Sequence, residues 1–298
     1  MAHASSPSRL IRLRALKSED LPPHPIIGPT SSSSVDLFQF LSDVLDDGVK
    51  FAEEVVPETF KTGADKTAPP AAAKVRILAR DMKRDELPHL DAKGETWFAR
   101  LSIHEDKAAA GTATFDEFEF GLRQNHATNE MTYMPSIFDA HLVADWSDLM
   151  NVNGRSVGGG YTDITMQIYE MAYQLPFPLA NRAFAQLIIT ANTSSDSFVV
   201  VQIPVDLSDF PEAEVLYING RNKRDGDSAL KKKKTVRGEY VSVERVKKTD
   251  MGDVSWLMAA SSDAKGAIPL ALQKWKLPDE ITKDVGFFLK FCAEQRAK

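Results

Sequence analysis

The sequence has one cysteine and no long apolar run, and both absences limit what the protein can be. Cys292 has no partner for an internal disulfide, which argues against a small secreted scaffold held together by disulfides. No apolar segment approaches the roughly 18 residues that a membrane-spanning helix needs. The first residues also lack the apolar core of a secretory signal peptide. We therefore expect a soluble protein.

Basic residues are not in excess either. The 298-residue chain has 36 Lys and Arg against 42 Asp and Glu, a formal charge of −6, so we expect no nucleic acid as its partner. Hydrophobic residues make up 43% of the chain, which is typical of a globular protein. A chain of this length can bury a sizeable core.

Residues 1–18 contain no acid and carry Arg9, Arg12, Arg14 and Lys17. This composition is typical of an organellar transit peptide, but it also fits a short element packed on the domain, which we favour. We predict a partly flexible N-terminal extension over residues 1–34 and a single domain over 35–298. We expect a cytoplasmic location, with an organelle or the nucleus as alternatives.

Three segments have apolar residues at helical spacing. The first follows Ser34, a candidate N-cap, and ends near Pro57. The second covers residues 114–134, with His126 and Glu130 on the same face as its phenylalanines. The third is the C-terminal helix, which we expect to begin at Pro278 and to carry Cys292 on its buried face. Residues 28–34 and 62–73 have the composition of loops.

Alternating and β-rich segments predict a mainly antiparallel sheet, because most of the connectors are too short for parallel crossovers. We expect strands over residues 74–81, 95–102, 138–146, 162–172, 183–191, 198–205, 236–246 and 254–262. The segment 198–205 is apolar at both parities, so this strand should be covered on both faces. The C-terminal helix, laid into the concave face of the sheet, is a suitable cover and can leave a cavity.

Four segments resemble the START superfamily of lipid-transfer, helix-grip domains. They are Trp97–Glu105, Leu175–Phe184, Gly238–Arg245 and, most specifically, Ser261–Leu270. The sequence is most similar to a fungal family of START-like domains of unknown function, over residues 35–297. The resemblance implies an α+β fold in which a curved antiparallel sheet wraps around a long C-terminal helix. It also implies a cavity for a hydrophobic small molecule or lipid, but no particular ligand.

We therefore predict a protein that carries or sequesters such a ligand. From strand parity and the face of the last helix, we expect the following residues to line the cavity: Met166, Ile168, Phe184, Trp256, Met258 and Phe288. A lipid carrier must visit membranes, and the basic run Lys231, Lys232, Lys233 and Lys234 could contact an anionic membrane surface. This run could also be a solvated loop, which is our default interpretation, or a nuclear-localisation signal.

The alternative is an enzyme of natural-product biosynthesis, a cofactor-independent cyclase or dehydratase that uses the same cavity. Its acid–base candidates are Glu170, His141 and Tyr240. Glu170 shares its parity with Met166 and Ile168, so it could enter an apolar site, but an ion pair with Arg182 or Arg245 is the favoured interpretation. A third possibility is a protein-interaction scaffold with a filled core.

We expect no metal and no cofactor. The glycines Gly158–Gly160 lack the lysine of a phosphate-binding loop. His104, Glu105 and Asp106 are consecutive, and consecutive strand residues alternate faces.

Overall fold

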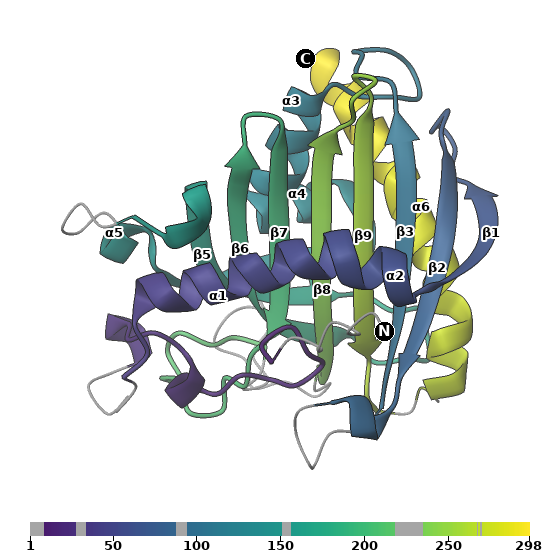
Figure 1. Cartoon of the computed structure of the whole chain (residues 1–298). Helices are drawn as coiled ribbons and strands as arrows, with labels where there is room; N and C mark the ends of the chain where they lie inside the picture. The colour runs from purple at the N-terminus through teal and green to yellow at the C-terminus, as the bar shows by residue number, and fades with distance from the viewer. Residues whose placement is uncertain are drawn as a thin grey trace.

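The computed structural model describes residues 9–27, 34–87, 94–150, 156–217, 235–266, 268 and 270–298. In these residues nine strands form one curved sheet with helices on both faces (Figure 1). The strands are β1 (Lys61–Thr67), β2 (Lys74–Met82), β3 (Glu95–His104), β4 (Ile137–Asp145), β5 (Thr162–Tyr173), β6 (Arg182–Ser194), β7 (Ser197–Pro204), β8 (Val236–Lys248) and β9 (Val254–Asp263).

The sheet order is β1-β2-β3-β9-β8-β7-β6-β5-β4, and neighbouring strands run antiparallel. The last six strands, β4 to β9, thus form the expected consecutive set. The pairing of β9 with β3 joins this set to the first three strands. A short parallel pairing also joins the start of β6 to the start of β8. The loop predicted over residues 62–73 is wrong in part, because β1 occupies Lys61–Thr67 and pairs with β2.

One face of the sheet is covered by α1 (Leu37–Lys50), which continues through a π-helical turn (Phe51–Val55) into α2 (Val56–Thr59). Figure 1 shows α1 crossing in front of the strands. Its N-cap is Asp36 and not Ser34, because the Asp36 carboxylate accepts hydrogen bonds from the backbone N–H groups of Phe38 and Gln39. A Cβ at Gly48 would lie 2.7 Å from a methyl group of Val201, so glycine allows α1 to approach β7 closely.

The N-terminal residues 9–27 pack into the core beneath α1. Ile11 and Leu21 are fully buried there, and Leu16 makes a parallel β-bridge with Val205. Short 3₁₀ turns lie at Ser18–Asp20, Pro25–Ile27, Arg84–Glu86 and Gly158–Gly160. The described N-terminal segment is therefore part of the folded core.

The other face is covered by α3 (Phe115–Phe118), a π-helical turn (Glu119–Arg123), α4 (His126–Tyr133) and α6 (Leu270–Arg296). Figure 1 shows α6 behind the sheet. The helix predicted over 114–134 is interrupted at Asn125, which has a left-handed backbone (φ 49°). Pro278 lies inside α6 and does not begin it. A short helix, α5 (Ser147–Met150), follows β4.

The sheet therefore separates two cores, as the residues of β7 show. Val199, Val201 and Ile203 belong to the apolar cluster beneath α1, whereas Phe198 and Val200 belong to the cluster beneath α6. The expectation that this strand is covered on both faces is confirmed. None of the described helices is long and apolar enough to cross a membrane.

Candidate functional site

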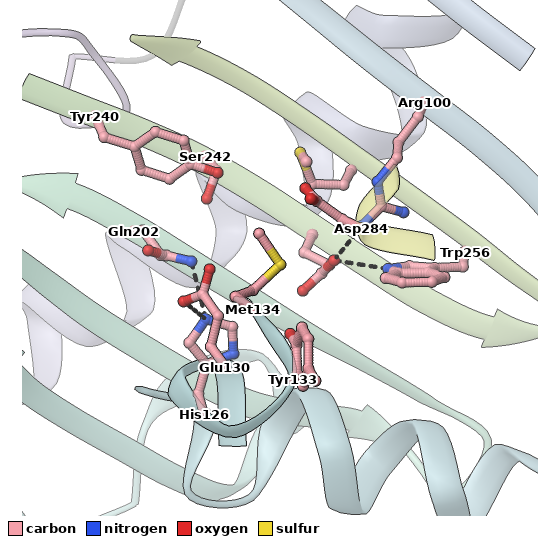
Figure 2. Close-up of a pocket in the computed structure, with 12 residues that line it drawn as sticks. Arg100, His126, Glu130, Tyr133, Met134, Gln202, Tyr240, Ser242, Trp256 and Asp284 are labelled. Atoms are coloured by element: carbon pink, nitrogen blue, oxygen red, sulfur yellow. Dashed lines mark hydrogen bonds and ion pairs between the residues drawn. The ribbon is translucent and has the colours of Figure 1, made fainter. Parts of the chain in front are cut away.

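An interior cavity lies between α4, α6 and the sheet (Figure 2). Its volume is about 30 Å³, which is space for roughly two water molecules. It is lined by Arg100, His126, Glu130, Tyr133, Met134, Gln202, Tyr240, Ser242, Glu244, Trp256, Met258 and Asp284. Polar and ionisable side chains thus dominate a cavity that the sequence predicts to be apolar.

The register of the strands brings the charged residues of the floor together. Met258 on β9 pairs with Arg100 on β3 and with Glu244 on β8, so the three side chains lie beside one another on the same face. Gln202 on β7 pairs in the same way with Ser242 on β8. The floor of the cavity is therefore built by four adjacent strands.

Arg100 is fully enclosed at the floor of the cavity. Its guanidinium stacks 3.8 Å from the centre of the Trp256 ring, and its Nη2 donates to Oε1 of Glu244 at 3.3 Å. The indole Nε1 of Trp256 donates to the same oxygen at 2.7 Å. The Nε and Nη1 atoms of Arg100 have no hydrogen-bond partner among the described residues. A buried N–H group without a partner is costly, so these two donors are available to a bound molecule.

His126 is a neutral part of the wall. Its Nδ1 lies against the carbonyl oxygen of Leu122, which accepts a hydrogen bond from it. Its Nε2 lies 2.9 Å from Nε2 of Gln202 and accepts from that amide. Burial lowers the pKa of His126, which agrees with this neutral tautomer.

Two carboxyl groups face the cavity from the helices, Glu130 from α4 and Asp284 from α6 (Figure 2). Burial, reinforced by the neighbouring carboxylates, raises the pKa of Glu130 to about 8. Burial also raises the pKa of Asp284 to about 7, although Arg100 opposes the shift. Oε2 of Glu130 is buried without a hydrogen-bond partner in the described part of the chain. At neutral pH Glu130 therefore holds its proton for most of the time, and Asp284 is about half protonated.

Two of the six residues predicted to contact a ligand, Trp256 and Met258, line the cavity. Phe288 lies next to it, with its ring 5.1 Å from that of Trp256. Phe184 lies further along the same face, where its ring contacts Tyr173 and Tyr240. The contact of these residues with a ligand stays a prediction.

Met166 and Ile168 lie on the opposite face of the sheet, in the cluster beneath α1. Strand parity correctly places them on one face, but that face is not the one that α6 covers. They do not line the cavity.

Of the acid–base candidates, only Tyr240 lines the cavity. Glu170 is fully buried elsewhere, and its Oε2 accepts hydrogen bonds from the backbone N–H groups of Leu216 and Tyr217 at 2.6 and 3.2 Å. His141 lies beside Glu170 on β4 and interacts through Nε2 with the carbonyl oxygen of Glu214. Both residues thus hold the segment that follows β7.

The expected partners of Glu170 are occupied differently. Arg182 donates to backbone carbonyls, including that of Ala264, and Arg245 pairs with Glu53. No finding supports the cyclase or dehydratase alternative. In the part of the chain that the structure describes, no group of three or more acidic, histidine or cysteine side chains is placed to hold a metal ion.

The role of Glu170 can be tested by Glu170→Gln. The amide has one acceptor oxygen and no charge, so the two backbone donors keep at most weaker hydrogen bonds. We expect a loss of about 1–3 kcal/mol in the free energy of unfolding, measured by urea denaturation. Ligand binding, measured on the folded variant, should be unchanged. A fully stable variant that has lost binding would contradict this structural role.

Sequence reasoning missed most of the lining, including its charged residues Arg100, Glu244 and Asp284. Arg100 and Glu244 have a signal, because each interrupts an otherwise β-rich apolar segment. Asp284 has none, since it does not share the apolar face of the last helix on which Cys292 lies. For His126 and Glu130 the sequence predicts a shared apolar helix face but no site. The basic run at residues 231–234, predicted as a possible membrane contact, lies outside the described residues.

Comparison with known proteins gives the family. A family model described as "Protein of unknown function (DUF3074)" matches residues 97–292. The chain belongs to the DUF3074 family. This matched range contains the whole cavity lining.

The DUF3074 protein is also similar in sequence to a curated relative and in fold to two solved structures. Uncharacterized protein C577.11 of Schizosaccharomyces pombe is 28% identical over 112 residues, and the match spans 38% of this chain and 38% of the relative. Human STARD10 has a TM-score of 0.54 at 13% identity, covering 90% of this chain and 84% of that one. Human StAR-related lipid transfer protein 5 has a TM-score of 0.55 at 10% identity, covering 87% of this chain and 97% of that one.

These likenesses show the fold. The predicted START-like, helix-grip architecture and the resemblance to a fungal START-like family of unknown function are confirmed.

Proposed function

We propose that this DUF3074 protein binds an amphipathic small molecule or lipid between α4, α6 and the sheet, and so carries or sequesters it. The observation that carries the proposal is the pair of buried guanidinium nitrogens of Arg100 that have no hydrogen-bond partner among the described residues, inside a START-like fold. One solved neighbour of the same fold is named a lipid transfer protein. A polar group of the ligand would accept from Arg100, and its apolar part would lie among the rings beneath α6.

A ligand larger than two water molecules needs more space than the cavity has. We propose that the N-terminal part of α6 moves to admit it. Pro278 has no N–H group to donate within the helix, and Trp275 on the same part of α6 is 72% exposed. Trp256, Met258, Phe288 and Phe184 are the proposed apolar contacts. A contact of residues 231–234 with an anionic membrane surface is part of the proposal and rests on their charge alone.

Native mass spectrometry of the purified protein, followed by extraction with organic solvent, tests this function. We expect a retained ligand mass, or saturable uptake of a fluorescent fatty acid or sterol. Arg100→Met should abolish that binding, whereas Arg76→Met, at an exposed arginine of β2 that pairs with Asp65, should not. A folded wild-type protein with no retained mass and no saturable uptake would overturn the proposal.

A further inference from the structure

We infer that the ligand presents a protonated amine next to an oxygen acceptor, as in a long-chain amino alcohol. This inference rests on the proposed function, because it assigns the polar end of the molecule that the cavity binds. It follows from the charges and hydrogen bonds of the cavity lining and from its buried polar atoms that have no hydrogen-bond partner in the described residues.

Acidic side chains outnumber basic ones in the cavity lining. Three carboxyl side chains, Glu130, Glu244 and Asp284, line it together with one guanidinium, that of Arg100. Glu244 already receives hydrogen bonds from Arg100 and Trp256, so its charge is compensated. When ionised, Glu130 and Asp284 add two negative charges that the lining does not balance. A buried charge without a counter-charge is unfavourable, and this favours the protonated form of both groups.

The remaining groups around the two acids supply no cation to the cavity. His126 lies 3.7 Å from Oε2 of Glu130, but its hydrogen bonds to Leu122 and Gln202 keep it neutral. Lys283, the neighbour of Asp284 in the chain, pairs with Glu280. The other titratable groups that act on the two acids from neighbouring elements are Tyr133, Tyr173, Tyr240, Glu244 and Arg100.

An ammonium group between Glu130 and Asp284 would provide the missing positive charge. Figure 2 shows Glu130 on α4 and Asp284 on α6 among the side chains that line the cavity, and the Asp284 carboxyl group acts electrostatically on that of Glu130. An ammonium has three N–H donors, and Oε2 of Glu130 is a buried acceptor without a partner in the described residues.

Arg100 determines the other polar group of the ligand, the oxygen acceptor next to the amine. Its free Nε and Nη1 donors require an acceptor oxygen, and the carboxyl groups of Glu130 and Asp284 require a cation. A fatty acid would satisfy Arg100 but would add another negative charge to the cavity. A hydroxyl or carbonyl oxygen next to an amine satisfies both requirements without adding negative charge.

Binding of the amine would exchange protons. The ammonium group keeps its proton, and Glu130 and Asp284 each release one to solvent as they form ion pairs with it. Because the cavity must lose these protons to bind the cation, the affinity should rise with pH while the carboxyl groups are protonated in the free protein. One released proton corresponds to a tenfold gain in affinity for each pH unit.

Isothermal titration with ligands of one chain length tests the inference. We would titrate the protein with a dodecyl amino alcohol, dodecylamine, dodecanol and dodecanoate at pH 6 and pH 8. The amino alcohol should bind most tightly, at least about tenfold more tightly than dodecanol at pH 8. Because two protons are released, its affinity should rise by at least about a hundredfold from pH 6 to pH 8, with proton release visible in buffers of different ionisation enthalpy. The affinity of dodecanol should not change.

The outcomes separate the two proposals. If dodecanol or dodecanoate binds as tightly as the amines, or if no proton is released, the inference on the amine is wrong and the proposed function stands. If none of the four ligands binds, the inference on the amine is wrong, and the retained mass or uptake measured by the experiment above decides the proposed function.

Two variants locate the effect. Glu130→Gln and Asp284→Asn imitate the protonated acids in shape, and each should flatten the pH dependence of amine binding. The matched control is Glu294→Gln, at an exposed acid of α6 that pairs with Lys290, and it should leave the pH dependence intact. An unchanged pH dependence in both cavity variants would also overturn the inference. Proton release by the wild-type protein provides a test that does not depend on how the variants fold.

Discussion

The variant Glu130→Gln should become increasingly more stable than the wild-type protein as the pH is raised from 5 to 8. In the folded protein the pKa of the Glu130 carboxyl is about 8, against 4.5 as its ordinary value. The folded state therefore holds a proton that the unfolded chain has lost, so the stability of the wild type falls as the pH rises through this window. For Glu130 the loss amounts to about 3 kcal/mol. Glutamine does not titrate, so the variant avoids this loss of stability.

Urea denaturation of both proteins at several pH values measures the difference between them. The comparison is necessary because buried His104 acts in the opposite sense: burial, together with Arg100, lowers its pKa to about 4. Its contribution rises with pH up to about 6.5 and cancels between wild type and variant. Asp284→Asn should behave as Glu130→Gln does. A difference in unfolding free energy that is constant from pH 5 to pH 8 would refute the protonated state of Glu130.

Phe288→Ala should destabilise the protein by about 3–5 kcal/mol, as expected when a buried phenylalanine is truncated and leaves a cavity. Phe288 is fully buried, and its ring lies 5.0 Å from that of Phe118, 5.1 Å from that of Trp256 and 5.8 Å from that of Tyr133. It therefore joins α6 to α3, α4 and the sheet. Thermal or urea unfolding gives the magnitude.

The control is Phe177→Ala, which truncates a phenylalanine that is 93% exposed and should change stability by less than about 0.5 kcal/mol. The space vacated in Phe288→Ala adjoins Trp256 in the cavity wall, so the variant should also take up a bulkier fluorescent ligand. Destabilisation equal to that of Phe177→Ala would show that Phe288 does not hold the layers together.

Much of this fold can be predicted because its signals are local. Alternation and turn residues mark the six strands from β4 to β9, and the apolar stripe of α6 correctly predicts buried Cys292. Double-sided burial of β7 follows from apolar residues at both parities. The pairing of β9 with β3 joins segments far apart in the chain, and no local pattern encodes it.

The cavity was harder to predict for the same reason. Parity shows that Met166 and Ile168 share a face, but which helix covers that face depends on tertiary packing. The polar lining needs the register of β3, β8 and β9, which places Arg100 and Glu244 on either side of Met258. Asp284 reaches the cavity only because α6 turns that side toward α4 and the sheet.

The division of the sheet into two cores has a consequence for motion. All twelve residues that line the cavity lie on the α6 side, whereas the core beneath α1 is mainly apolar and the buried charges Arg12 and Glu95 pair with each other there. Opening of α6 would leave the strands hydrogen-bonded to one another and still covered from the α1 side. In hydrogen–deuterium exchange, amides of α4 and α6 should therefore exchange through partial opening, well before those of β6 and β7, which should exchange only on global unfolding.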